Sequence, residues 1–530
     1  MRIGLAQINT TVGDFDANLE RVVAAARRGK EASLVVFPEM ALCGYMPRDL
    51  LWEDAFLDAC EKALQRLART SGLPPLLVGT PLRVEGAGKP LIHAAVLLRD
   101  GGTTIVAKRL IPSYDVFDER RYFRPGPACD PIEVDGTRVG VTICEDLWSG
   151  EWSNAQYDGD PIADLKAKGA DLIVNVSASP YARGKPELRR RIARSHAGRH
   201  GLPIALCNLV GANNQLVFDG NSFALDGGGA LCAHAAAFRE DFVLTDFGGR
   251  AQAPDDDVAS AIVLGIRDYF HKTGFKEALI GLSGGVDSSL LACLAAEALG
   301  PEQVTGVAMP GPFSAAISLE DAEELAGRLG IGFASLPITQ AYERLRTDLG
   351  EQWGDLPFDE AEENLQARLR GVFLMALANK RDALVLVASN KSELAMGYCT
   401  FYGDMVGALA PIADLYKTEV FELAHNYDLP PRVLERPPTA ELRPDQTDQD
   451  TLPPYEVLDA ILALHLEQRL RPEAIVEHGF DAGLVRRVLR TVARMEFKRQ
   501  QGAPVLKLGP KAFGLGRRFP IVERFSGGAP

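Results

Sequence analysis

The stretch "EALIGLSGGVDSSLLACLAAEALG", residues 277–300, decides how the second half of the chain folds. A short apolar run enters a glycine-rich loop, and a helical pattern from Val286 to Leu299 follows and stops at a glycine. The backbone amides of such a loop and the N-terminus of the helix can converge on an anion. The loop lacks the lysine of a Walker A motif, and Ser283, Ser288 and Asp287 instead offer hydroxyls and a carboxylate suited to Mg²⁺.

The same loop also contains G-x-S-x-G, the spacing of a nucleophile elbow, which needs an Asp and then a His later in the chain. His425, His465 and His478 follow it, in helix-like or loop contexts and without an accompanying motif. The loop alone therefore leaves a phosphate cradle and a serine nucleophile both open.

Strand and helix patterns alternate regularly through the rest of this half. Such βαβ repetition predicts a parallel, doubly wound sheet whose ligand lies at the carboxyl ends of the strands. We expect strands in residues 277–282, 303–310, 333–339 and 383–389, and helices in residues 286–299, 319–330 and 361–380. Residues 428–455, with "PPTAELRPDQTDQDTLPP", predict a long Pro-rich functional loop.

The first half mixes short β-rich runs with amphipathic helical stretches and predicts a layered α/β domain with a mixed sheet. The strand signals include "RIGLAQI", "SLVVFPE", "PLLVGTP", "HAAVLLR", "TTIVAKR", "RVGVTICE", "ADLIVNVSA", "LPIALCNLV" and "NSFALDG". The "DGG" at residues 100–102 predicts a hairpin. Residues 246–260 are rich in Gly, Pro and Asp and lack periodicity, so we expect a linker there between domains 1–245 and 261–530.

The composition is that of a soluble protein, with 46% hydrophobic and 24% charged residues. A net charge of -14 argues against a protein that coats nucleic acid or an anionic membrane. The eight cysteines form no C-x-x-C pair, the N-terminus has no signal-peptide core, and no apolar run approaches the length of a membrane span. We therefore expect a cytoplasmic protein.

Three strands of the first half end in reactive side chains: Glu39, Lys108 and Cys144. A thiolate is a nucleophile, a nearby ammonium lowers the pKa of the thiol and stabilises an oxyanion, and a carboxylate moves the proton. The alternative is a buried core thiol with two solvated charges. His196 and His200 have the i, i+4 spacing of metal ligands, but no acidic ligand motif accompanies them, and we expect them on the surface of an Arg-rich helix.

The segments "FPEMALCGY", "AKRLIPSYDVFDERRYFRPG" and "GVTICEDLW" resemble the nitrilase, or carbon-nitrogen hydrolase, superfamily over about the first 240 residues. The resemblance implies an α-β-β-α sandwich in which Glu39 is the general base, Lys108 the oxyanion stabiliser and Cys144 the nucleophile. It also matches Glu119 to the superfamily's second acidic residue.

The S-G-G-x-D-S-S loop resembles the pyrophosphate loop of enzymes that adenylate a carboxyl or carbonyl oxygen. A nitrilase-like amidase in front of such a domain resembles the glutamine-dependent NAD synthetase family along essentially the whole chain, unlike the Cys-His-Glu amidotransferase of GMP synthetase or the N-terminal cysteine of asparagine synthetase. The supporting motifs are "EENLQARLRG", "SNKSELAMGYCTFYGDM", "PIADLYKTEV", "RPPTAELRPDQTDQD" and "EFKRQQGAPVLKL".

This resemblance implies ATP-dependent amidation of deamido-NAD to NAD with ammonia from L-glutamine, Mg²⁺ as cofactor, and a homo-oligomer, a dimer or an octamer, with ammonia channelling. Another glutamine-dependent adenylating amidotransferase, acting on a different carboxylate, is the alternative. The implied glutamine contacts are Tyr114, Ser179 and Lys185. The implied ATP contacts are Gly281, Leu282, Ser283, Gly284, Gly285, Val286, Asp287, Ser288, Ala388, Lys417 and Thr439. The implied deamido-NAD contacts are Asn364, Glu393, Asp404, Lys498, Lys507 and Lys511, with Asp287 and Glu393 near the metal.

The sequence departs from the family pattern at two places. Ala388-Ser389 replaces the usual Thr-Gly, so a hydroxyl contact to ATP is lost at residue 388 or moves to Ser389. The segment "MPGPFSAAIS", residues 309–318, is less polar than its family counterpart, which affects the contacts expected on the adenine side.

Overall fold

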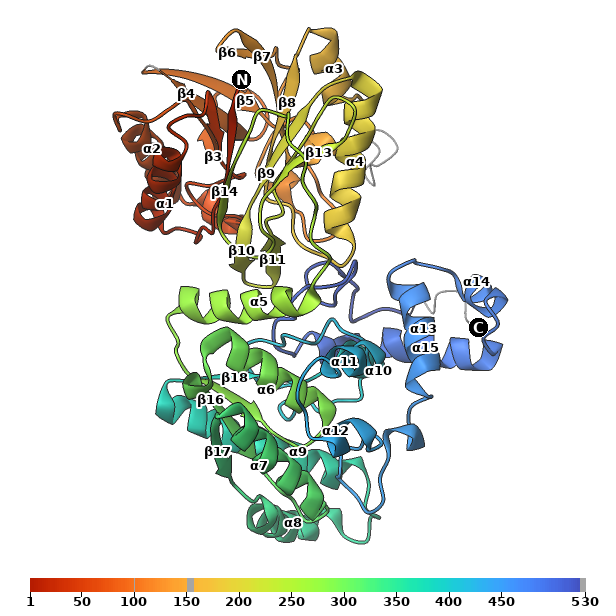
Figure 1. Cartoon of the computed structure of the whole chain (residues 1–530). Helices are drawn as coiled ribbons and strands as arrows, with labels where there is room; N and C mark the ends of the chain where they lie inside the picture. The colour runs from red at the N-terminus through yellow and green to blue at the C-terminus, as the bar shows by residue number, and fades with distance from the viewer. Residues whose placement is uncertain (100, 150–156, 525–530) are drawn as a thin grey trace. The chain divides into compact units, whose positions relative to one another are not determined.

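A computed structural model describes residues 1–99, 101–149 and 157–524 (Figure 1). The chain divides into two compact units, Met1–Ala261 and Ile262–Pro530. The passage between them falls within α5 (Val258–Thr273), so residues 258–260 of the expected linker are helical. The remainder of that linker stays a prediction.

The first unit contains two six-stranded sheets. One has the order β14-β1-β2-β3-β4-β5, and the other has the order β13-β12-β9-β8-β7-β6. The strands of the first sheet are β1 (Ile3–Gln7), β2 (Leu34–Val36), β3 (Leu76–Arg83), β4 (Leu91–Arg99), β5 (Gly102–Ala107) and β14 (Asp241–Thr245). The strands of the second are β6 (Ile132–Val134), β7 (Thr137–Ile143), β8 (Leu172–Ser177), β9 (Ile204–Asn208), β12 (Phe223–Leu225) and β13 (Leu231–His234). A separate hairpin joins β10 (Val210–Asn213) and β11 (Leu216–Asp219).

The two sheets pack face to face and helices cover their outer faces. Leu5 and Val36 of one sheet share a buried core with Val141 and Val174 of the other. The opposite faces pack against α1 (Phe15–Arg28) and α2 (Asp54–Ala68) on one side, and against α3 (Pro161–Ala167) and α4 (Lys185–His200) on the other (Figure 1). The expected α-β-β-α sandwich is therefore confirmed, as is the hairpin between β4 and β5, although Asp100 lies outside the described residues.

Helix α4 differs from its prediction. It ends, as expected, with a glycine in the left-handed conformation, Gly201 at φ 64. Its arginines and histidines, however, do not all face solvent: Arg189 is fully buried in an ion pair with Asp219 at 2.5 Å, and His196 is 1% exposed. The expectation that His196 lies on the surface is wrong, because a buried acid and a buried carbonyl give this face of the helix polar partners inside the protein.

The second unit is built on a parallel sheet of order β17-β16-β15-β18. Its strands are β15 (Ala278–Gly281), β16 (Val304–Ala308), β17 (Gly332–Ser335) and β18 (Leu384–Leu386). The chain runs outward through α6 (Val286–Leu299) and α7 (Ala316–Leu329), then returns to the other edge through α8 (Thr339–Trp353) and α9 (Glu360–Arg381). Because right-handed crossovers in opposite directions place helices on opposite faces, this is the doubly wound sheet that the sequence predicts.

Short helices complete the second unit around a separate apolar core. They are α10 (Lys391–Met396), α11 (Lys417–Ala424), α12 (Pro431–Glu435), α13 (Tyr455–Leu466), α14 (Pro472–Glu477), α15 (Ala482–Arg494) and α16 (Glu496–Arg499). The Pro-rich segment 428–455 is thus not entirely loop, since α12 lies within it. Among the described residues, no helix combines the length and apolar character needed to cross a membrane.

Candidate active sites

A buried lysine lies between two buried carboxylates in the first unit. Lys108 follows β5, and its Nζ donates to Oε1 of Glu39 at 2.8 Å and to Oε1 and Oε2 of Glu119 at 2.9 and 2.8 Å. Tyr45 donates its hydroxyl to Oε1 of Glu119 at 2.9 Å. Burial alone would lower the pKa of Lys108, but the two carboxylates raise it well above its usual value. Lys108 is therefore a fixed ammonium at physiological pH.

Cys144 lies at the carboxyl end of β7 with a strained backbone. Its φ is 43, in the left-handed region that a residue with a Cβ rarely adopts, and its side chain is buried. Burial and the charge of Glu39 raise the pKa of the thiol well above its usual value, against the opposing effect of Lys108. The ammonium of Lys108 lowers the pKa of the thiol, as expected, but burial outweighs this effect. The resting group is a neutral thiol, which needs a base.

His93 is a member of this cluster that the sequence did not indicate. It lies within β4, fully buried, with Nε2 3.3 Å from Oε1 of Glu39 and Nδ1 3.4 Å from Oε2 of Glu119. Its local sequence, "LIHAAVLLR", is an ordinary apolar strand. Only the pairing of β4 with β5 brings it beside Lys108, whose backbone N–H donates to the carbonyl of His93 at 2.8 Å.

Glu145, next to the cysteine, accepts hydrogen bonds from two tyrosines. Tyr114 donates its hydroxyl to Oε1 and Oε2 of Glu145 at 2.9 and 3.0 Å, and Tyr157 donates to Oε1 at 3.1 Å. Burial raises the pKa of Glu145 to about 7. Its position directly after Cys144 was the available sequence signal for this residue, which we did not predict.

The other two residues expected at glutamine also lie in the first unit. Lys185 begins α4, with its Nζ 5.9 Å from the ring centre of Phe117 and 5.8 Å from that of Trp148. Ser179 is buried and donates its backbone N–H to Oδ1 of Asn208 at 2.9 Å. The ring of Phe117 also packs edge-on against Tyr114 at 5.5 Å. Tyr114 and Lys185 thus flank one aromatic side chain.

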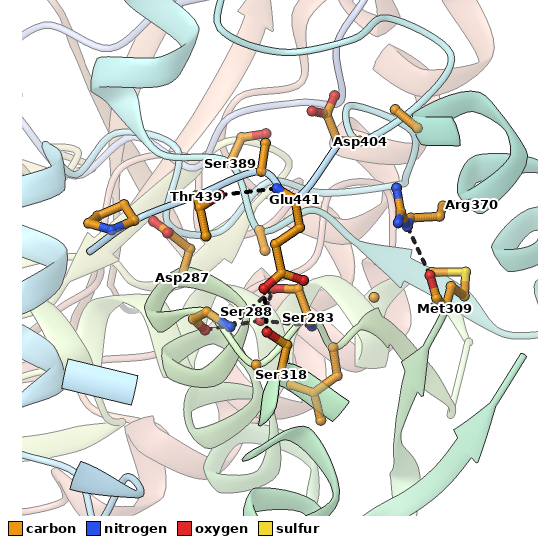
Figure 2. A pocket seen from close by; sticks show the side chains of 18 of the residues that line it. Ser283, Asp287, Ser288, Met309, Ser318, Arg370, Ser389, Asp404, Thr439 and Glu441 are labelled. Atoms are coloured by element: carbon orange, nitrogen blue, oxygen red, sulfur yellow. Dashed lines mark hydrogen bonds between the residues drawn. The ribbon is translucent and has the colours of Figure 1, made fainter. Parts of the chain in front are cut away.

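The second unit has a cavity of about 330 Å³ at the carboxyl ends of its parallel strands. Loop residues 281–288, the ends of β16 and β18, and residues 436–442 of the Pro-rich segment line it (Figure 2). The cavity therefore lies where a doubly wound sheet binds its ligand.

The glycine-rich loop bonds to itself and opens a helix. Gly284 has φ +77, Gly285 precedes the first turn of α6, and the N–H of Gly285 donates to Oγ of Ser283 at 3.2 Å. The Oγ atoms of Ser283 and Ser288 lie 3.0 Å apart. No histidine stands among the described residues that line the cavity. This geometry favours the phosphate cradle over the nucleophile elbow.

Beside the loop, a buried lysine bridges two acids. Nζ of Lys417 donates to Oδ2 of Asp287 and lies 3.5 Å from Oε1 of Glu393. Asn390 donates to Oδ1 of Asp287 at 2.9 Å. Burial and the nearby charge of Asp287 raise the pKa of Glu393 to about 8, although Lys417 opposes this. Lys417 therefore does not fully compensate the charge of the Glu393 carboxylate. The carboxylate oxygens of Asp287 and Glu393 fit a hard divalent cation.

The Pro-rich segment is joined to the loop by residues that we did not predict. Arg436 donates to the carbonyl oxygen of Gly284 at 2.9 Å and to Oγ of Ser318 at 3.0 Å. Glu441 accepts from the same Ser318 hydroxyl at 2.5 Å and from the N–H of Ala315 at 3.2 Å (Figure 2). Arg436 thereby connects the glycine-rich loop to α7 and to the Pro-rich segment.

Comparison with known proteins gives matches along the full length. Residues 2–248 match the carbon-nitrogen hydrolase family, and residues 258–502 match the NAD synthase family. A glutamine-dependent NAD(+) synthetase from Synechocystis sp. is 43% identical over 99% of both chains, and one from Thermotoga maritima is 39% identical over 99% of both. The chain belongs to the glutamine-dependent NAD(+) synthetase family. A synthetase of this family from Acinetobacter baumannii, solved in complex with ADP, superposes with a TM-score of 0.78 at 35% identity and covers 100% of this chain and 99% of its own.

Within this NAD(+) synthetase fold, the cavity brings together most of the expected nucleotide residues. The lining includes the loop from Gly281 to Ser288, Ala388, Ser389, Glu393, Asp404, Lys417 and Thr439. Burial raises the pKa of Asp404 to about 6. Because Ser389 lines the cavity beside Ala388, its hydroxyl is available in place of the one lost at residue 388.

The remaining residues expected at deamido-NAD do not stand among those that line the cavity. Asn364 accepts the Thr400 hydroxyl at 2.5 Å, and the N–H of Thr400 donates to Asp404 at 2.6 Å. Lys498 donates to the carbonyls of Gly397 and Cys399, at the end of α10. Lys507 is buried and donates to the carbonyls of Gly509 and Pro510, and Lys511 lies in the same tail. The roles of these four residues at deamido-NAD stay predictions.

Proposed function

We propose that this protein amidates deamido-NAD to NAD, the last step of NAD biosynthesis, with ATP and with ammonia released from L-glutamine, and yields AMP, pyrophosphate and glutamate. The observation that carries the proposal is the presence, in one chain, of a Glu39–Lys108–Cys144 amidase cluster and a glycine-rich anion cradle. The ADP bound by the relative from Acinetobacter baumannii supports a nucleotide in the second site.

In the first site, Glu39 takes the thiol proton as Sγ of Cys144 attacks the amide carbon of glutamine. Lys108, fixed as an ammonium by Glu39 and Glu119, donates to the oxyanion. Glu39 passes the proton to the departing ammonia, which leaves a thioester on Cys144. Water, deprotonated by Glu39, then attacks the thioester, glutamate leaves, and the thiol regains its proton.

Substrate recognition in this site follows from the charges around it. Glutamine carries an ammonium and a carboxylate on its α-carbon. The carboxylate of Glu145, held by Tyr114, is complementary to the ammonium, and the cation of Lys185 to the carboxylate. Ser179, buried at the end of β8, supplies a further polar contact.

In the second site, an oxygen of the nicotinate carboxylate attacks the α-phosphorus of ATP, and the bond to pyrophosphate breaks. The amides and hydroxyls of loop residues 281–288 hold the departing pyrophosphate. Asp287 and Glu393 would hold Mg²⁺, which supplies positive charge to the triphosphate. Ammonia then attacks the activated carbonyl carbon, and AMP leaves.

We further propose that ammonia passes between the sites without release to solvent, because in water it would mostly be protonated and lose its nucleophilicity. We also expect a homo-oligomer, a dimer or an octamer, in the cytoplasm. The eight cysteines are all free thiols, which fits a reducing compartment. Light scattering on the purified protein tests the oligomer, and competition from external ammonium during glutamine-dependent turnover tests the passage.

The Cys144→Ala variant tests the whole proposal. It should abolish NAD formation with glutamine and spare NAD formation with ammonium salts at matched ATP and deamido-NAD. Cys129→Ala, which removes a half-buried thiol of the same unit, is the control and should keep both activities. Loss of both activities in a folded Cys144→Ala protein would contradict a relay between two sites.

A further inference from the structure

A second group of metal-ligand side chains lies in the first unit, outside the cysteine site. Asp160 precedes α3, and His196 and His200 stand one turn apart on α4. Each offers one ligand atom, and these three atoms lie within 4.8 Å of one another. The i, i+4 pair therefore has the acidic companion that its local sequence did not indicate.

One ring nitrogen of His196 makes no hydrogen bond within the described residues. Its Nε2 lies 3.0 Å from the carbonyl oxygen of Leu147, which can only accept, so Nε2 carries the proton and Nδ1 keeps a lone pair. His196 is 1% exposed, and its Nδ1 is buried with no hydrogen-bond partner among the described residues. A buried polar atom left in this way destabilises the fold. A metal-binding histidine usually donates its other ring N–H to a carbonyl or carboxylate, which fixes the tautomer in the same way.

His200 and Asp160 lie close to His196 and offer the other two ligand atoms. His200 stacks on His196 with ring centres 6.0 Å apart and planes at 13°, and within the part of the chain that the structure describes its Nε2 is also buried without a hydrogen-bond partner. The carboxylate of Asp160 is anchored through Oδ1, which accepts from Ser149 Oγ at 3.0 Å and from the N–H groups of Ile162 and Ala163.

We propose that Asp160, His196 and His200 bind a divalent transition-metal ion, with Zn²⁺ as the best match. Two imidazoles and a carboxylate are a common zinc set, whereas Mg²⁺ and Ca²⁺ prefer oxygen ligands alone. Zinc bonds of about 2.0–2.1 Å place tetrahedral ligand atoms about 3.4 Å apart, so separations of up to 4.8 Å would contract by up to about 1.4 Å. His200 is only partly buried at the end of α4 and can make that adjustment.

The proposed metal site contacts the segment that carries Cys144 through one backbone carbonyl, that of Leu147. Leu147 ends the 3₁₀ helix Cys144–Leu147, so the chain of contacts runs from the ion through His196 to the segment that carries the nucleophile. An ion held there stabilises the fold around that segment, and it takes no part in the amidase chemistry. The proposal therefore stands independently of NAD synthesis.

Titration calorimetry of the full-length protein with zinc chloride tests the site. The Cys144→Ala background removes the catalytic thiol as a competing ligand. Compared with this background, His200→Ala should weaken binding by more than about 100-fold, since loss of a group that only hydrogen-bonds to a ligand already costs about 10–100-fold. Asp160→Asn should also weaken it, and asparagine retains the helix cap, so the fold is kept. His271→Ala, which removes an exposed histidine on α5, should bind zinc unchanged.

Thermal unfolding supplies a second measurement. Zinc should raise the melting temperature of the background and of His271→Ala, and this increase should be absent in His200→Ala and Asp160→Asn. Equal zinc affinity in all four proteins would overturn the proposal and assign the ion to another site. Absence of zinc binding in the background would overturn it as well.

Discussion

Gly284 is the point in the pyrophosphate loop where a single methyl group has the largest predicted effect. Its φ of +77 strains any residue with a Cβ. A Cβ built there would lie 2.3 Å from the carbonyl oxygen of Ser318, and 3.0 Å from both its C and Cα atoms, all of them backbone. Ser318 cannot move freely away, because Arg436 and Glu441 both bond to its hydroxyl.

The expected size of the effect follows from these distances. Ordinary contact to a Cβ begins at 3.4 Å, so Gly284→Ala must displace the loop by about 1 Å, and a misplacement of about 1 Å typically costs a reaction about 100-fold. The left-handed backbone adds about 1–2 kcal/mol of strain. We therefore expect the ammonia-dependent kcat/KM for ATP to fall about 100-fold.

The assay measures NAD formed from deamido-NAD, ATP and ammonium chloride, with glutamine hydrolysis measured separately. Gly284→Ala should lose the first activity and keep a folded glutaminase. Its neighbour is the matched control: Gly285 has φ -88, and a Cβ there meets only the flexible Oγ of Ser283 at 3.3 Å, so Gly285→Ala should keep most activity. Wild-type rates with ammonia in a folded Gly284→Ala protein would refute the cradle geometry.

Three further predictions address the buried charges. The pKa of Glu145 is raised from 4.5 to about 7, so the native state holds this proton more tightly and its stability falls as pH rises between these values. Denaturant unfolding should therefore show that Glu145→Gln gains up to about 3 kcal/mol of stability over wild type between pH 4.5 and about pH 8. A difference in stability that does not change with pH would contradict this. Glu119→Gln removes a counter-charge that fixes Lys108, and should lower the kcat of glutamine hydrolysis about 100-fold while sparing ammonia-dependent synthesis; unchanged hydrolysis would argue against Glu119 as a positioning residue. Lys417→Met leaves Asp287 without its buried cation and should reduce the free energy of unfolding by about 3–5 kcal/mol, with part regained in the double variant with Asp287→Asn; additive losses would show that the pair is not coupled.

Local signals were sufficient where one segment determines its own structure. The helix over Val286–Leu299 is found at its predicted bounds, because glycines precede and follow it and its apolar residues are continuous. Helix α8 was not expected, since Tyr342 is its only buried residue and its pattern has no clear apolar stripe. The short strands β6, β11, β13 and β14 were also not expected, because three to five residues carry too little periodicity.

The missed functional residues depend on contacts between distant segments. His93 resembles a core residue until β4 pairs with β5, and Arg436 meets Gly284 across 152 positions of sequence. The burial of His196 was missed for the same reason, because Leu147, whose carbonyl oxygen lies 3.0 Å from Nε2 of His196, comes from another part of the chain. Sequence motifs predicted the reacting groups, whereas the groups that contact them became visible only in the tertiary structure.

The neutral state of Cys144 has a consequence for the survival of the protein under oxidative stress. Peroxides and alkylating reagents attack the thiolate and react slowly with a protonated, buried thiol. Because burial and Glu39 favour the protonated form of Cys144, we expect the unliganded site to form sulfenic acid slowly. In the proposed mechanism the thiol becomes reactive only when Glu39 removes its proton, so between turnovers fewer thiols enter the oxidation series that ends in the irreversible sulfinic and sulfonic acids.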